Sequence, residues 1–439
     1  MRDKVMAAYP GGLRSPAIAF DETANSTDSG SGTLGLIAAS GCALAIGSGP
    51  ILSTNESLSI VPQILSLLGA GLAALTLLKG IPRFHISLLA YVTLVVFWGI
   101  TLLSDPDLWP YYQSLLKVCL FAIACYFAFR SRQHLLILFG VYAATGAITV
   151  PLNWHQLQAL GASMEVSQLS DKDRFAGTFQ NANVASIYGV LLMLSGLIMG
   201  FSIKKWWRWP LTLIGLLAGL LICFFSGSRK GMLGVGLLFL IVPWMAAQSG
   251  RNGRRSSLKI IFFVIISLAL GGLLLSQLPF TDRLLVPFKE GVAAESSSRE
   301  RFAMLQKAVE LWGTSPLLGC GFEGFRRLSG FDTYSHTTLG EVLCNAGLFG
   351  LGLLGVFYIV PGIQLWRLIR NGAASGLSQI AIALLGFWAI FILFSFFAVM
   401  FDSPCEFVPI YAAICGFLQS NRGRPSFQTF VPGPERGEG

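Results

Sequence analysis

Long apolar segments separated by short polar connections make up most of the chain. About twelve of these segments carry few or no charges, and at about 20 residues each is long enough to cross a bilayer as an α-helix. They lie at residues 34–52, 58–78, 84–103, 111–129, 134–152, 184–203, 209–226, 231–247, 258–278, 337–365, 378–401 and 407–420. The pattern predicts an all-α, polytopic integral membrane protein with about twelve transmembrane helices.

Two connections are longer than the others, residues 153–183 and residues 279–336. Long connections in a compact fold are usually functional or disordered. The second contains a predicted helix, Ser298 to Trp312, with apolar side chains at helical spacing: Phe302, Leu305, Val309 and Trp312. We expect this amphipathic helix to lie along the outer membrane surface, with its arginines facing the mouth of the helix bundle.

The charged residues orient the chain in the membrane. The sequence is 54% hydrophobic and only 12% charged, with a net charge of +9. If both termini are cytoplasmic, most Lys and Arg fall on the inner side, and the short inner connections contain no Asp or Glu. This is the positive-inside pattern. Orientation and contact with anionic lipids therefore explain the basic balance, and a nucleic-acid partner is not expected.

These predictions divide the chain into five parts. Residues 1–33 are polar, without an apolar core near Met1, and are predicted to be a disordered cytoplasmic tail and not a signal peptide. The remaining parts are membrane helices one to nine at 34–278, an extracytoplasmic loop carrying the surface helix at 279–336, helices ten to twelve at 337–420, and a cytoplasmic tail at 421–439.

The cysteines and acidic residues give little sign of a metal or cofactor site. Six of the eight cysteines lie inside apolar segments, which is typical of small core residues. Cys320 and Cys405 would both lie at the outer face, so a disulfide between them remains open. Asp105 and Asp107 come nearest to a metal motif, but a carboxylate pair on a turn is weak support. No metal and no cofactor are expected.

Two candidate residues lie at the start of the tenth predicted helix. His336 precedes it, where a histidine either transfers a proton, for example from a sugar hydroxyl, or hydrogen-bonds a loop carbonyl. Glu341 lies about one and a half turns further into the apolar segment. An ionisable group there is costly and usually faces a polar cavity, so it is either catalytic or the partner of a buried basic residue.

Basic residues accompany this histidine on the predicted outer face. Arg174 stands before a turn and a helix N-cap that contain Asn181 and Asn183, a place suited to an anion, although an arginine there can also reach lipid phosphates. Arg229 and Lys230 lie in a tight outer turn, although the positive-inside pattern places most basic residues on the inner side. Arg299 and Arg301 flank Glu300, and either arginine can pair with it. Together these residues suit a lipid-linked phosphate or pyrophosphate, whose leaving charge the cations would stabilise.

Four stretches carry a family resemblance. RFAGTFQNANVAS, FSGSRKGML, RFAMLQKAVELWGTSPLLGCGFEGF and SHTTLGEVLCNAGLFG occur in this order across roughly residues 170–355. They resemble, respectively, the Arg-x-x-Gly-Thr-Phe-x-Asn-x-Asn stretch, the Ser-x-Ser-Arg-Gly turn, the Pro-Leu-Leu-Gly-x-Gly segment and the histidine motif of the O-antigen ligase and polymerase superfamily. The members of this superfamily are bacterial membrane glycosyltransferases.

The resemblance implies an activity and its site. A glycan would be transferred, with inversion and without metal, from an undecaprenyl-pyrophosphate carrier at the outer face of the bacterial inner membrane. Carried over by position, Arg174, Arg229 and Arg301 would bind the pyrophosphate and His336 would activate the acceptor hydroxyl, so residues 279–336 become the catalytic loop. Lys230, Arg299, Glu341, Asn181 and Asn183 are supporting candidates. The acceptor is lipid A core, a growing glycan or a protein.

This chain departs from the family pattern at two places. Lys230 stands where a glycine is expected, and Asn345, followed by Ala346, stands where many relatives have an acidic residue. Two other classes of function remain open. A transporter of a small anion such as bicarbonate would need charges along a path inside the helices, where the sequence offers mainly Lys117 and Glu341. A non-catalytic scaffold for polysaccharide assembly would show no transfer activity.

Overall fold

The computed structural model describes residues 29–52, 60–77, 83–102, 106–156, 179, 181–203, 206, 208–249, 296–371, 377–401 and 407–422. These residues form helices and no strand. The helices are α1 (Ser29–Leu52), α2 (Ile60–Thr76), α3 (Ile86–Thr101), the 3-10 turn η4 (Pro106–Leu108), α4 (Trp109–Ala128), α5 (Arg132–Leu152), α7 (Ala182–Ser202), α8 (Arg208–Ser226), α9 (Arg229–Ser249), α12 (Ser296–Thr314), α13 (Gly324–Leu328), α14 (Thr338–Asn371), α15 (Leu377–Ser395) and α16 (Phe407–Ser420).

The predicted all-α fold is confirmed for this part of the chain. Every predicted membrane segment contains a helix except 258–278, which lies outside the described residues. Six helices, α1, α4, α5, α7, α8 and α14, are long and apolar enough to cross a membrane, and shorter apolar helices lie in α2, α3, α15 and α16. The composition of these helices agrees with a multi-pass membrane protein. The count of twelve spans stays a prediction.

Two helix boundaries differ from those predicted by several residues. α1 begins at Ser29, so the end of the predicted disordered tail 1–33 is helical. α15 ends at Ser395 instead of continuing to residue 401. After Ser395 the chain turns, and the N–H groups of Phe397 and Ala398 both bond back to the carbonyl of Phe394. This turn brings backbone carbonyls to the candidate site.

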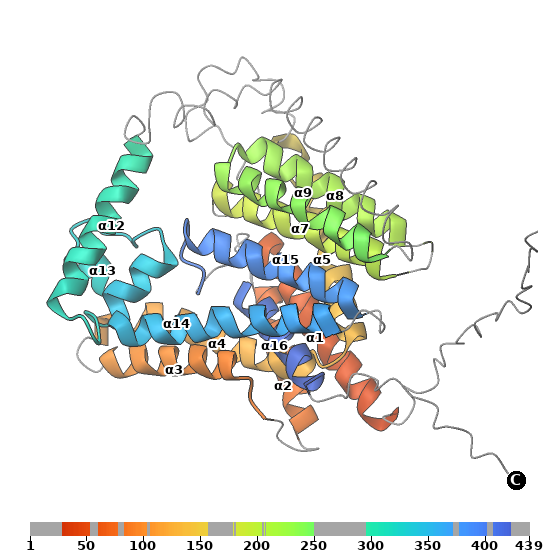
Figure 1. Ribbon diagram of the computed structural model, residues 1–439, viewed down its shortest axis with the longest axis horizontal. Helices are drawn as coiled ribbons and strands as arrows, with labels where there is room; N and C mark the ends of the chain where they lie inside the picture. The colour runs from red at the N-terminus through yellow and green to blue at the C-terminus, as the bar shows by residue number, and fades with distance from the viewer. Residues whose placement is uncertain are drawn as a thin grey trace, which may run out of the picture.

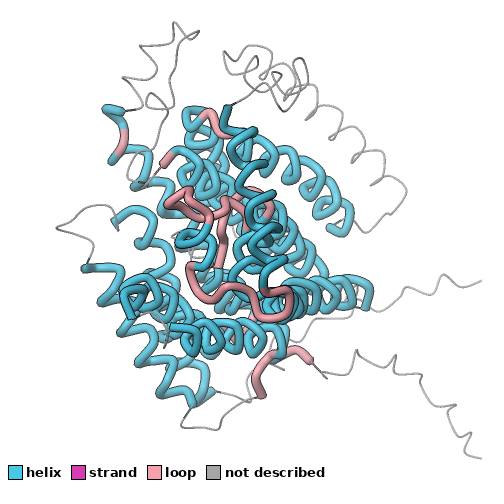
Figure 2. The backbone as a smooth tube through the Cα atoms, turned by 90° about the vertical axis from the view of Figure 1, so that its left-hand side faces the viewer, coloured by secondary structure: helices cyan, strands magenta, loops and turns pink. Residues whose placement is uncertain are grey.

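Most of the helices run side by side, and α12 and α13 lie at one end of them, where α12 crosses the direction of α14 (Figure 1). Figure 2 views the molecule from that end, with the helices in cyan and their connecting loops in pink. α7 is buried along nearly its whole length. It packs closely on α8 because both present glycines: a Cβ on Gly215 would lie 2.7 Å from the carbonyl oxygen of Leu192. Small residues at such contacts are typical of membrane helix pairs.

Arg83 and Arg132 mark the end of the bundle opposite to α12 and α13. Arg132 donates to the carbonyl of Ser202 at 2.7 Å, where α7 ends, and Arg83 precedes α3. The opposite end of α3 meets the segment before α13, because Phe322 N–H donates to Thr101 Oγ1 at 3.0 Å. Arg83 and Arg132, two of the basic residues that the charge pattern assigns to the inner side, therefore lie away from α12 and α13.

α14 contains a break that the sequence did not predict. Gly347 has φ 60° and ψ −154°, outside the helical region. The backbone groups freed there pair with the loop of residues 316–321: Cys320 N–H donates to the carbonyl of Cys344 at 2.8 Å, and Leu348 N–H to the carbonyl of Pro316 at 2.9 Å. Buried backbone groups need such partners. The Pro-Leu-Leu-Gly-x-Gly loop thus completes the hydrogen bonding of α14.

Replacing Gly347 with alanine is expected to destabilise the protein. A Cβ there would lie 2.5 Å from the carbonyl oxygen of Leu317, and φ 60° is strained for any residue with a side chain, so we expect a loss of about 1–3 kcal/mol or more. Thermal unfolding in detergent measures it. Gly352 and Gly355 are matched controls on the same helix, since a Cβ at either position meets nothing within 4 Å. Equal melting temperatures for all three alanine variants would contradict this role of Gly347.

Candidate functional site

A small hydrophobic core fixes α12 and α13 onto the start of α14. Met304, Ala308 and Leu311 from α12 pack with Phe325 of α13 and Cys344 of α14. This core is separate from the main core of the bundle. It sets the position of α12, and hence of Arg301, relative to the residues that begin α14.

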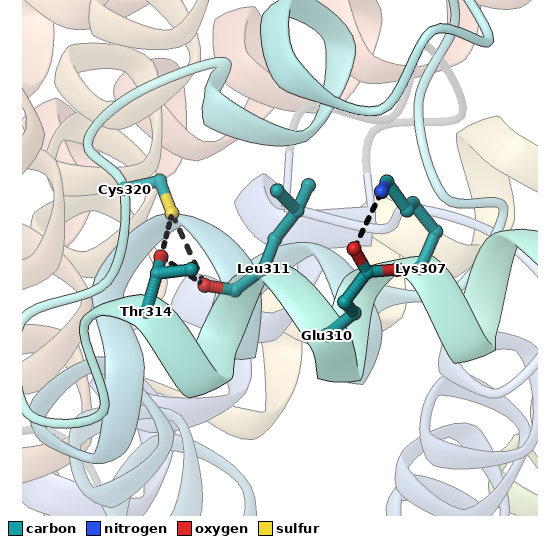
Figure 3. Close-up of polar contacts among 5 residues, drawn as sticks. All are labelled: Lys307, Glu310, Leu311, Thr314 and Cys320. Carbon is teal, nitrogen blue, oxygen red and sulfur yellow. Dashed lines mark hydrogen bonds and ion pairs between the residues drawn. The ribbon is translucent and has the colours of Figure 1, made fainter.

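α12 (Ser296–Thr314) includes the helix predicted over Ser298–Trp312, but a different set of side chains attaches it to the protein. Phe302 is 60% exposed and Val309 is 45% exposed, whereas Met304 and Ala308 are buried. The predicted apolar stripe therefore faces away from the protein, as an amphipathic surface helix requires. Lys307 and Glu310 form an exposed ion pair at 2.7 Å on the same helix (Figure 3).

His336 adopts a conformation that side chains rarely allow. Its φ of 58° lies in the left-handed region, which residues other than glycine seldom adopt, although histidine does so more often than most, and such conformations cluster at functional sites. Hydrogen bonds hold the chain on both sides of it. Ser335 N–H donates to Glu341 Oε2 at 2.8 Å, and Thr338 Oγ1 donates to the carbonyl of Ala398 at 2.8 Å. The ring packs edge-on against Tyr334, with centroids 4.6 Å apart.

Glu341 is buried, with 2% of its surface exposed, and ties three segments together. While one carboxylate oxygen accepts from Ser335 N–H, the other accepts from Asn345 Nδ2 at 2.9 Å. Asn345 Oδ1 in turn accepts from Phe325 N–H at 2.9 Å, in α13. Glu341 thus positions the histidine loop against α13 and α14. Its hydrogen-bond partners are neutral donors, and the charge of Arg326 in α13 also acts on its carboxylate.

The turn before α9 brings two more predicted residues to the same place. Lys230 is only 8% exposed, and its Nζ donates to the carbonyl of Phe397, in the turn after α15. Arg229 is the first residue of α9. Ser228 Oγ donates to Asn183 Oδ1 at 3.0 Å, and Asn181 caps α7 by accepting from Asn183 N–H and Val184 N–H. The turn and the start of α7 are therefore held together.

The site lowers the pKa of His336 to about 4. Burial of the ring is the largest cause, because it disfavours the charged form, and the positive charges of Arg301 and Lys230 add to it. These two cations come from α12 and α9, far from His336 in sequence. His336 is therefore neutral at pH 7 and its imidazole is available to accept a proton.

Not every predicted site residue joins this cluster. Arg299 is exposed on α12, and Arg174 lies outside the described residues. Cys405 and Asp105 also lie outside them, so the Cys320–Cys405 disulfide stays a prediction. In the ranges that the structure describes, no three His, Cys, Asp or Glu side chains gather as a metal site would require.

Substituting Glu341 with alanine is expected to remove most of the glycan transfer that the family resemblance implies. The change leaves two buried donors, Ser335 N–H and Asn345 Nδ2, without an acceptor, at a cost of about 1–3 kcal/mol each, and it releases the loop that holds His336. Glu341→Gln keeps one of the two acceptors and should lose less. Initial rates of transfer measure both variants. Glu310→Ala, which removes only an exposed ion pair, is the control, and equal activity of all three variants would exclude the positioning role.

Residues 214–355 match the family model described as O-antigen ligase. No curated protein sequence matches the chain. The matched region contains Arg229, Arg301, His336 and Glu341, whereas the stretch around Arg174 precedes it. The match indicates a membrane enzyme of the ligase or polymerase type. The resemblance seen in the sequence motifs is thereby confirmed: residues 214–355 carry an O-antigen ligase domain of the O-antigen ligase superfamily.

Proposed function

We propose that the protein is an inverting glycosyltransferase that moves a glycan from an undecaprenyl-pyrophosphate carrier to an acceptor hydroxyl. The observation that carries the proposal is the placement of neutral His336 beside the cations Arg301 and Lys230. A general base and a set of phosphate-binding cations are the two groups that such a transfer needs. The site would face the extracytoplasmic side of the inner membrane.

In the proposed mechanism, His336 takes the proton of the acceptor hydroxyl while the hydroxyl oxygen attacks the anomeric carbon of the donor. The bond from that carbon to the pyrophosphate oxygen breaks on the opposite face, which inverts the configuration. Arg301, Arg229 and Lys230, with Arg174 as a further candidate, would bind the leaving pyrophosphate and stabilise the charge that develops on it. No step in this scheme uses a metal ion.

Binding of the donor would also change the pKa of the general base His336. In the free protein the nearby cations lower the pKa of His336. A bound pyrophosphate places negative charge beside the same cations, which raises the pKa of His336 from about 4 toward its ordinary value. His336 would then be a stronger base when the donor is present than when it is absent.

The acceptor decides between a ligase and a polymerase. The test supplies a labelled glycan on a polyprenyl pyrophosphate to the protein in proteoliposomes, with lipid A core, a second carrier-linked glycan or a peptide as acceptor. Label on lipid A core supports a ligase, and a lengthened carrier-linked glycan supports a polymerase. No label on any acceptor, together with bicarbonate flux that His336→Ala leaves unchanged, would replace the transferase with a transporter.

A further inference from the structure

Cys320 and Cys344 form a pair of thiols at the break in α14. Cys320 belongs to the loop that pairs with the break, and its N–H donates to the carbonyl of Cys344 at 2.8 Å. The two side chains share the small core that joins α12, α13 and α14. The partner of Cys320 in the described part of the chain is therefore Cys344.

The two sulfurs differ in accessibility. Cys344 is fully buried, while Cys320 is partly exposed. Cys320 Sγ donates to the carbonyl of Leu311 at 3.4 Å and lies 3.7 Å from Thr314 Oγ1, at the end of α12 (Figure 3). The hydrogen bond between their backbones brings the two residues to neighbouring positions, and a disulfide needs Cα atoms roughly 4.4–6.8 Å apart.

We propose that Cys320 and Cys344 are a redox pair that is oxidised to a disulfide in the mature protein, locking the Pro-Leu-Leu-Gly-x-Gly loop to α14. The proposal rests on the extracytoplasmic placement of the site, because disulfides form and persist in oxidising compartments. The backbone hydrogen bond and the shared core already hold the two residues next to each other.

The oxidation is a thiol–disulfide exchange with a disulfide-bonded oxidant, either a protein or a small molecule. The thiolate of the partly exposed Cys320 attacks one sulfur of the oxidant, forming a mixed disulfide and releasing one thiol. The thiolate of Cys344 then attacks the sulfur of Cys320 and releases the second thiol. The two cysteines lose two electrons and two protons, and the oxidant gains them as two thiols.

The bond would close a loop that contains α13 and His336. A cross-link of this kind stabilises a protein mainly by restricting the unfolded chain. It would also hold the loop against Gly347 while glycans bind and leave. The loop that supports His336 would then depend on the oxidation state of the protein.

The test compares the protein purified from membranes without reductant with the same protein after reduction. Free thiols are alkylated before reduction and newly exposed thiols afterwards with a second reagent, and mass spectrometry identifies the peptides. We expect Cys320 and Cys344 to carry the second label, a melting temperature several degrees higher before reduction than after it, and loss of this difference in Cys320→Ser and in Cys344→Ser. Cys119→Ser, a single buried thiol on α4, should retain the difference.

A membrane-impermeant maleimide, applied to reduced spheroplasts, separates the two ways in which the proposal can fail. Cys320 labelled from outside, with the first alkylating reagent found on both cysteines of the unreduced protein, would overturn the disulfide and leave the proposed placement of the site intact. Cys320 that reacts only after the spheroplasts are broken would overturn the extracytoplasmic placement, and with it both proposals.

Discussion

His336→Ala is expected to reduce glycan transfer by a factor of at least about 10², the contribution that a positioned general base typically makes. The imidazole is the group near Arg301 and Lys230 that is neutral at pH 7, and alanine has no atom that accepts a proton. The variant should still bind the donor, because the cations remain. The measurement is the rate of transfer at saturating donor, together with donor affinity.

His155→Ala is the matched control for this substitution. His155 is exposed and follows the end of α5 at Leu152, so its removal should change neither rate nor affinity. His336→Ala should also leave the melting temperature near that of the wild type, because the ring contact that it removes is with Tyr334 of the same loop. Normal transfer by His336→Ala would remove the general base from the proposed mechanism.

Arg301→Ala is expected to lower transfer by about 10²–10³-fold, as the loss of one group that stabilises developing charge commonly does. The guanidinium lies close enough to His336 to lower its pKa, so a pyrophosphate beside the histidine would be within its reach. Arg301→Lys keeps the charge but loses paired donors and should recover part of the rate. Arg299→Ala, two residues earlier and exposed on α12, is the control.

The same substitution has a second, independent consequence for pH dependence. Activity requires neutral His336, so kcat/KM of the wild type should fall only as the pH drops toward about 4, the pKa in the free protein. Arg301 is one of the two cations that lower this pKa, and removing it raises the pKa toward 6.5. The acid limb of kcat/KM should therefore move to higher pH in Arg301→Ala. An unmoved limb, with the rate lowered, would mean that Arg301 acts away from His336.

The helices could be predicted from the sequence because apolar segments of membrane length have a strong pattern. The break at Gly347 could not, since residues 337–365 form one apolar run. It depends on the loop of residues 316–321, which meets α14 only in the folded protein. The loop backbone approaches α14 so closely that a side chain does not fit at Gly319 of the Pro-Leu-Leu-Gly-x-Gly segment, where a Cβ would lie 2.5 Å from Ala346 N.

The candidate site was predicted in part. The resemblance to the family selected His336, Arg229 and Arg301, whereas the residues that hold the histidine loop were missed or given another role. Thr338 Oγ1 donates a hydrogen bond to the carbonyl of Ala398. The sequence does not show which backbone carbonyl a side chain will reach in the folded protein. Thr337, whose Oγ1 accepts from Gly340 N–H at 2.9 Å at the start of α14, was a signal that could have been used, because Ser or Thr before an apolar run often begins a helix.

The most direct measurement of the central claim is transfer by the purified protein in detergent, using a synthetic polyprenyl-pyrophosphate glycan and an acceptor glycan in the presence of EDTA. The wild type and His336→Ala are assayed side by side. Product from the wild type alone is the predicted result, since the site supplies a base and cations from its own side chains. Product that disappears with EDTA, or that His336→Ala forms at the wild-type rate, would contradict a metal-independent transferase built around His336.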